Sequence, residues 1–296
     1  MTETLRSIVH PWECDSVEHF TTGYYFRAYS GAQWHLLQLL GFSEHDMAAL
    51  RPRSCRTGFS RELRAGDPYH IESGVLEQGS GSLTLGHRLY NSETGELGST
   101  HIQTFGGEVR PVAAAQPIDW EEQDAGPDID FDRYSVWSTT GQSIVREGDL
   151  DHTGLLDLSS LIHHTSDANV QFQNRIGMTS SYMVEKRIGF ATFAYRIRIH
   201  ELPRRPGTIM RTETALAHLG RSSLWFAHRV VNSSDSSPIA NVAQLGVHFD
   251  RVGRVPARIP DQIRQRAQSY LGQPDRSPEG APVGHRAGAD RVRREV

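Results

Sequence analysis

The stretch that decides the fold is CDSVEHFTTGYYFRAYSGAQWHLLQLLGF, residues 14–42. From Tyr25 to Leu40, apolar side chains recur at intervals of three and four residues, which is typical of a helix that buries one face. Gly41 follows them, where a residue in the left-handed conformation commonly ends a helix. The sequence therefore predicts a long core helix over about 22–40.

The loop before this helix carries ionisable side chains. Asp15 and His19 stand four residues apart, and Tyr25 follows ten residues after Asp15. The amides at a helix N-terminus have no helical partner and can stabilise a developing negative charge. The pattern indicates a functional site at the start of the helix. The plainer alternatives are that Asp15 caps the helix or a turn and that His19 is a surface histidine.

Composition excludes several classes of protein. The chain has 296 residues, 37% of them hydrophobic and 22% charged, which suits a globular protein of two domains. A formal net charge of −4 gives no reason to expect nucleic acid or an anionic membrane as a partner. No apolar run approaches the roughly 20 residues of a membrane span. Cys14 and Cys55 form neither a disulfide framework nor a metal motif. We expect a reduced, cytoplasmic protein without a metal or cofactor.

The segments after the helix have the character of an antiparallel sheet. Residues 43–55 are expected to form a connecting segment. Strand-like alternation follows over 59–78, broken by the turn dipeptide Gly66-Asp67, and two more strands are expected at 82–91 and 97–106. Gly-containing turns separate these segments. A further short strand is expected over 5–11. One helix beside an antiparallel meander predicts an α+β fold.

The chain then repeats this pattern. SLTLGHRLYNS at 82–92 matches SLWFAHRVVNS at 223–233 with an offset of 141, and Gln103 and Gln244 share that offset. Aligning Gly189-Phe190 with Gly41-Phe42 places the second helix within 169–190, at an offset of 148. The repeat predicts two copies of one fold. Two such half-sheets are expected to pair edge to edge, because each then covers an edge strand of the other.

The remaining segments fall between and after the two copies. We expect one unit over 1–110, an acidic linker over 111–150 and a second unit over 151–252. Residues 253–296 are expected to form a C-terminal helix, within 259–272, followed by a disordered tail from Gln273.

Taken together, these residues resemble the hotdog-fold acyl thioesterases, in particular a double-hotdog member of the branch that resembles 4-hydroxybenzoyl-CoA thioesterase. The likeness is carried by ECDSVEH and YYFRAYSGA within 13–32, similar to the family's Asp-x-x-x-His motif before a long helix, and by the strand pattern of 59–105. The resemblance implies an α+β fold of two tandem hotdog units. In each unit, a curved antiparallel sheet wraps a long central helix.

The resemblance also implies a reaction, which is hydrolysis of an acyl-CoA or acyl-carrier-protein thioester without a cofactor. Asp15 stands at the position of the catalytic carboxylate, as nucleophile or general base, and His19 accompanies it. The residues expected to bind substrate in the first copy are Thr22, Tyr24 and Tyr25. The usual Asn two positions after the His is absent, since position 21 is Thr.

The second copy departs from the motif under the same alignment. His163 replaces the Asp, Asp167 replaces the His, and Asn169 occupies the position of Thr21. We therefore expect these three residues to help bind substrate, in one composite active site rather than two complete ones. Homodimers or higher oligomers of the double-hotdog chain are possible partners in assembly.

Other readings remain open from the sequence. Cys14 is expected to be an inert packing thiol, and the equivalent His87 and His228 a structural hydrogen bond repeated by duplication. The spacing of His163, His164 and Asp167 lacks the further ligands of a metal site.

No run of basic residues marks a CoA phosphate site, for which the candidates are Arg51, Arg53 and Arg56. The competing functions are a hotdog dehydratase or hydratase and a non-catalytic acyl-binding protein.

Overall fold

The computed structural model describes residues 1–15, 17–109, 120 and 129–271. The first half of the chain contains β1 (Thr2–Ile8), α1 (Thr22–Leu39), α2 (Glu44–Ala49), β2 (Leu50–Phe59), β3 (Pro68–Gly79), β4 (Ser82–Asn91) and β5 (Leu97–Gly107). The second half contains β6 (Ser138–Ile144), α3 (Leu158–Ile176), α4 (Ser180–Lys186), β7 (Ile188–Ile199), β8 (Ile209–Leu219), β9 (Ser223–Asn232), β10 (Pro238–Asp250), β11 (Val255–Pro256) and α5 (Asp261–Gln268).

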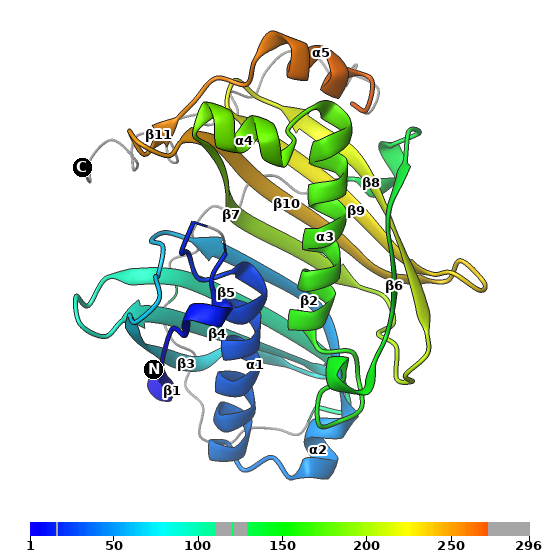
Figure 1. Ribbon diagram of the computed structural model, residues 1–296. Helices are drawn as coiled ribbons and strands as arrows, with labels where there is room; N and C mark the ends of the chain where they lie inside the picture. Colours follow the sequence, from blue (N-terminus) through cyan, green and yellow to red (C-terminus); the bar gives the residue numbers. More distant parts are fainter. Residues whose placement is uncertain (16, 110–119, 121–128, 272–296) are drawn as a thin grey trace, which may run out of the picture.

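The strands form one 11-stranded antiparallel sheet in the order β1-β3-β4-β5-β2-β7-β10-β9-β8-β6, with β11 beside β10. The two halves repeat the same strand order from edge to centre. They join where β2 pairs with β7, from Ser54 opposite Arg198 to Gly58 opposite Ala194. Helices α1 and α3 lie side by side against this curved sheet (Figure 1). The expected α+β fold of two tandem hotdog units is confirmed, and so is the edge-to-edge pairing.

The first central helix forms where its sequence predicts. Thr21 is the N-cap of α1, and the buried face includes Tyr25, Tyr29 and Leu36. Gly41 follows the helix with a φ of 80°, a conformation that costs glycine little.

The predicted position of the second central helix was wrong. That helix is α3, and the predicted range 169–190 holds only its last part, then α4 and the start of β7. The glycine that ends α3 is Gly177, with a φ of 93°, whereas Gly189 lies in an extended strand. From Gly41 to Gly177 the offset is 136, against 141 for the strands. The second copy is therefore five residues longer between helix and third strand, whereas the expected helix offset of 148 would have made it seven residues shorter.

The expected connection over 43–55 was also wrong, because it contains α2 and much of β2. The β2 sequence LRPRSCRTGF lacks an apolar alternation, since Arg51 and Arg56 are exposed and the buried positions include Cys55 and the polar Thr57. The sequence pattern did not predict this central strand because its outer face is charged.

The core continues through the joint between the two halves. Phe26 and Cys55 of the first half belong to one buried cluster with second-half side chains that include Tyr195, Ile197 and Val242. Each such side chain contributes about 1.5–3 kcal/mol when buried. The joint is therefore a hydrophobic interface as well as a hydrogen-bonded one.

The predicted unit boundaries stay predictions. Strand β6 lies inside the expected linker of 111–150 and pairs with β8, while α5 lies inside the expected C-terminal helix range. Most of the acidic run and the tail from Gln273 lie outside the described residues. Within the described ranges, no helix is long and apolar enough to cross a membrane.

Candidate functional site

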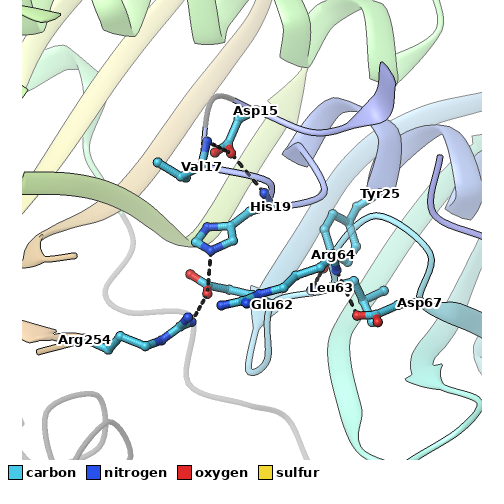
Figure 2. Close-up of polar contacts among 9 residues, drawn as sticks. All are labelled: Asp15, Val17, His19, Tyr25, Glu62, Leu63, Arg64, Asp67 and Arg254. Carbon is cyan, nitrogen blue, oxygen red and sulfur yellow. Dashed lines mark hydrogen bonds and ion pairs between the residues drawn. The ribbon is translucent and has the colours of Figure 1, made fainter. Parts of the chain in front are cut away.

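The loop before α1 closes on the carboxylate of Asp15. Asp15 Oδ1 accepts hydrogen bonds from the backbone N–H groups of Val17 (2.8 Å) and His19 (3.0 Å), and the Asp15 N–H donates to the His19 carbonyl (2.9 Å). Figure 2 shows the side chain turned toward this backbone. Aspartate commonly closes such turns. The expected capping role is therefore present, and it also holds an exposed carboxylate next to the start of α1.

His19 links this loop to both halves of the molecule. Its Nε2 lies 3.1 Å from Glu62 Oε2, and the same carboxylate pairs with Arg254, which follows β10 (Figure 2). An isolated β-bridge joins His19 to Arg64. Both His19 and Glu62 are partly buried, so solvent screens this pair less than a fully exposed one. The ring is thereby fixed beside the motif loop.

The two tyrosines at the start of α1 lie in different environments. Tyr25 is buried under Phe20 and Phe59, and its hydroxyl accepts from the Leu63 N–H (3.2 Å). Burial raises the pKa of Tyr25. Tyr24 is half-buried and lies edge-on to the His163 ring, 5.3 Å between centroids. Tyr25 thus supports the loop from the core, while Tyr24 faces the second half.

Cys14 has the properties of a packing thiol. Its Sγ donates to the His10 carbonyl at 3.6 Å. Burial raises the pKa of Cys14, and the neighbouring Asp15 charge raises it further. Because the thiolate is the nucleophilic form, these surroundings disfavour a nucleophilic role at neutral pH.

The start of α1 meets buried polar groups of the second half. Thr22 Oγ1 lies 3.2 Å from the Tyr195 hydroxyl on β7. That hydroxyl also bonds to Ser166 on α3 and to Thr192, although burial is the larger effect and raises the pKa of Tyr195. Gln244 of β10 donates from Nε2 to Thr192 Oγ1 (2.8 Å). A chain of polar contacts therefore runs from the first helix to β10.

Two buried oxygen atoms close to this chain have no partner within the described residues. They are Thr21 Oγ1 and Asn169 Oδ1. Thr21 precedes Thr22, and Asn169 lies about one helical turn beyond Ser166. An unpaired buried polar atom costs about 1–3 kcal/mol. Such a cost is retained most readily where a ligand supplies the missing hydrogen bond.

The motif positions assigned to His163 and Asp167 were wrong, because the alignment used the wrong glycine. With Gly177 matched to Gly41, both residues lie within α3 rather than before it. The His163 ring packs on Gly23, where a Cβ atom would lie 2.4 Å from His163 Cε1. Burial lowers the pKa of His163, and Asp167 acts in the opposite direction. Asp167 itself is exposed. Of the three second-half predictions, His163 therefore packs against the start of α1, and Asn169 is buried further along α3.

The true counterpart of Asp15 is Asp151, which sequence reasoning missed. Asp151 Oδ1 accepts from the N–H groups of Thr153 (2.8 Å) and Leu155 (3.1 Å), and the Asp151 N–H donates to the Leu155 carbonyl (2.7 Å). This is the loop geometry of Asp15, with Leu155 in place of His19. The offset of 136 from Asp15 to Asp151 would have revealed it.

The two loops have different surroundings. The Asp151 loop borders a cavity of about 30 Å³. Nearby, the Trp34 and His152 rings lie 3.7 Å apart, and Ser30 donates to Asp157 (2.9 Å). The Asp15 loop borders a cleft of about 130 Å³. The residues lining that cleft are Val17, His19, Arg64, Phe249, Arg251 and Arg254.

The buried histidines repeat by duplication, as expected. His87 Nδ1 lies 2.6 Å from the Ser73 hydroxyl, and His228 Nδ1 lies 2.8 Å from the Thr214 hydroxyl. Burial lowers the pKa of His228 to about 4. Within the described part of the chain, no three His, Cys, Asp or Glu side chains gather as a metal site.

Comparison with known families identifies the fold and the superfamily. The model of the thioesterase-like superfamily matches residues 9–108 and 145–267, so the chain belongs to that superfamily. The matched ranges cover both halves, and the expected resemblance to double-hotdog acyl thioesterases is confirmed. No curated protein matches the chain.

Several solved structures share this fold. An acyl-ACP thioesterase from Bacteroides thetaiotaomicron is 8% identical over 83% of this chain and 96% of its own, with a TM-score of 0.59. A 12:0-ACP thioesterase from Umbellularia californica is 11% identical over 83% and 93%, with a TM-score of 0.60. The tesB protein of Mycobacterium avium is 12% identical over 83% and 94%, with a TM-score of 0.52. At these identities the likeness establishes the fold alone.

Proposed function

We propose that this protein hydrolyses an acyl-CoA or acyl-carrier-protein thioester at the Asp15 loop. The observation that carries the proposal is the position of Asp15, held by two backbone N–H groups beside the start of α1. Membership of the thioesterase-like superfamily supports the reaction class. The second half completes the site with the buried polar groups around Tyr195.

Two routes use the same carboxylate. As a general base, Asp15 takes a proton from water while the water oxygen attacks the thioester carbonyl. The tetrahedral intermediate then expels the thiolate, which takes the proton back and leaves as the thiol. As a nucleophile, an Asp15 oxygen attacks the carbonyl and expels the thiolate, and water then hydrolyses the resulting mixed anhydride. Both routes yield one acid and one thiol per water consumed.

The start of α1 is suited to the oxyanion that both routes create. The N–H groups of Thr22 and Gly23 begin the helix and have no helical carbonyl to pair with. The Tyr24 N–H is already bonded to the Thr21 carbonyl (3.0 Å). Preorganised donors of this kind, at the positive end of a helix dipole, stabilise developing negative charge. We therefore propose that the backbone N–H groups of Thr22 and Gly23 bind the oxyanion.

The groups from the second half have a positioning role in this proposal. Asn169 keeps a buried oxygen that can accept a hydrogen bond from substrate, and Gln244 bonds to Thr192 in the same chain of polar contacts. A pantetheine arm carries amide N–H groups that could supply such bonds. We therefore expect these residues to affect substrate placement more than the chemical step.

An assay with a panel of acyl-CoA thioesters tests the proposal. Wild-type protein is incubated with aliphatic and aromatic acyl-CoAs, and free thiol release is followed alongside the absorbance of an enoyl-CoA. Thiol release in step with acid formation supports hydrolysis. A change in enoyl absorbance without thiol release would identify a hydratase instead. Saturable binding without turnover on CoA or carrier-protein thioesters would leave an acyl-binding protein.

A further inference from the structure

The cleft beside the Asp15 loop is basic, and both halves of the molecule build it. Arg64 comes from the connection between β2 and β3, while Arg251 and Arg254 come from the turn after β10. His19 lines the same cleft. We call this the basic cleft. Any group bound there lies next to the motif loop.

The charges of the basic cleft are only partly balanced. Glu62 pairs with both Arg254 and His19 (Figure 2). No ion pair between described residues involves Arg64 or Arg251, and both side chains are exposed. Two guanidinium groups therefore remain available. Arginine binds phosphate through two parallel hydrogen bonds, which makes it a preferred phosphate ligand.

The neighbouring carboxylates are directed elsewhere. Asp250 Oδ1 accepts from the N–H groups of Val252 and Gly253, which closes the turn that presents Arg251. Asp15 Oδ1 accepts from its own loop. Neither carboxylate is paired with Arg64 or Arg251. The residues that line the cleft thus include three arginines and no carboxylate.

Among the described residues, the cavity beside the second motif loop has a different charge. It is lined by Asp151 and Asp157 and by no lysine or arginine. Arg205, at the offset of 141 from Arg64, is exposed and does not line that cavity. Among the described residues, the positive charge is therefore found beside the Asp15 loop, whereas Arg110, which precedes Arg251 by 141, lies outside the described residues.

The arginines considered from the sequence do not contribute to the basic cleft. Arg51, Arg53 and Arg56 all lie on β2 and are not among the cleft residues. Arg51 Nη1 donates to the carbonyls of Ala48 (2.7 Å) and Leu50 (3.1 Å), so it caps the end of α2.

We propose that the basic cleft binds a phosphate ester on the pantetheine arm of the thioester substrate, and that this contact loads substrate at the Asp15 loop only. This inference rests on the proposed thioesterase function and specifies its substrate class. CoA and the phosphopantetheine arm of a carrier protein share the phosphate ester. A thioester without phosphate would lack the contact and bind more weakly.

The test varies the arginines and the phosphates together. Arg64→Ala, Arg251→Ala and the double variant are compared with wild type, and Arg205→Ala is the matched control. One acyl group is presented on CoA, dephospho-CoA, 4′-phosphopantetheine and N-acetylcysteamine, the last without phosphate. We expect the double variant to raise KM about tenfold or more for the phosphate-bearing thioesters, with kcat unchanged. KM for the N-acetylcysteamine thioester, and all values for Arg205→Ala, should change less than about twofold.

The substrate series also identifies the phosphate. An increase in KM that persists with the phosphopantetheine thioester assigns the phosphate of the arm itself, which carrier proteins share. An increase confined to acyl-CoA would place the 3′-phosphate of the CoA ribose in the cleft instead and would overturn the proposal. An equal increase for the N-acetylcysteamine thioester, or none for any substrate, would overturn the proposal.

Calorimetric titration with CoA separates this inference from the proposed function, because it requires no hydrolysis. Weaker CoA binding by the double variant than by wild type supports the basic cleft, even if no thioester is hydrolysed. Equal affinity of the two proteins for CoA, together with hydrolysis at an unchanged KM, would reject the basic cleft and retain the thioesterase.

Discussion

The Asp15 loop and the Asp151 loop share a backbone turn and differ in the side chains that line the space beside it. Each carboxylate accepts from the N–H groups two and four residues further along the chain. The first is followed by His19 and borders a cleft with three arginines. The second is followed by Leu155 and borders a cavity of about 30 Å³ with two carboxylates. Duplication preserved the turn, and the side chains around it diverged.

This difference shows that a carboxylate at the motif position is weak evidence for catalysis. The aspartate has a structural role in both loops, because it satisfies two backbone donors at the entry to a central helix. What distinguishes a candidate active site is the rest of the set: an adjacent histidine, space for substrate and a matching charge. Only the Asp15 loop combines all three within the described residues.

The largest expected effect comes from removing the charge of each aspartate in turn. Asp15→Asn keeps an oxygen that can accept from Val17 and His19, so the loop should persist while the base or nucleophile is lost. We expect kcat to fall by about 10² or more, with little change in melting temperature. Asp151→Asn should leave kcat within about twofold. Steady-state kinetics and thermal unfolding check both, and the reverse ranking would mean that the second loop is the active one.

A second prediction compares the buried cores behind the two helices. His101 in the first half is buried with its pKa lowered to about 4, and the residue at the offset of 141 is Val242. Below a pH of about 6.5, His101 is protonated in the unfolded state and stays neutral in the folded state. The free energy of unfolding therefore falls as the pH drops toward 4. At pH 5 this cost is about 2 kcal/mol.

His101→Val should remove that part of the acid sensitivity. Its stability at neutral pH is also expected to drop, because Thr57 and Gln103 lose their partner. The relevant readout is therefore the slope of unfolding free energy against pH between 4 and 6.5, from denaturant titrations. A slope as steep as that of wild type would show that His101 is not the group that titrates.

The smallest effect is expected from the polar lining. Asn169→Ala should raise KM several-fold with a minor change in kcat, because Asn169 is assigned to substrate placement. Gln33 is its counterpart at the offset of 136, is also buried and lines the cavity beside Asp151. Gln33→Ala should therefore leave KM unchanged. Equal effects of the two substitutions on KM would remove the distinction between the two sites.

The sequence predicted the first unit better than the second for identifiable reasons. The helix over 22–40 and the repeat of 82–92 at 223–233 rest on long apolar patterns, which packing preserves. The second helix was misplaced because Gly189-Phe190 resembles Gly41-Phe42 in letters, whereas the φ of Gly177 decides where α3 ends. The identity of two residues does not determine the backbone conformation at the glycine.

The composition of the candidate site was predictable only in part. Asp15, His19 and Asn169 follow from the motif and its neighbourhood. Arg251 and Arg254 approach the loop through the pairing of β2 with β7, a contact between distant segments of the chain. A single sequence carries no local signal for such a contact, so the basic cleft emerged only from the structure.

The central claim is that one of the two motif loops binds substrate. Calorimetric titration with a non-hydrolysable acyl-CoA thioether measures this directly, because it counts the molecules bound to each chain. The account predicts one molecule per chain for wild type, and the same for Asp151→Asn. Two molecules per chain with similar affinities would show that both loops bind substrate and would contradict the account.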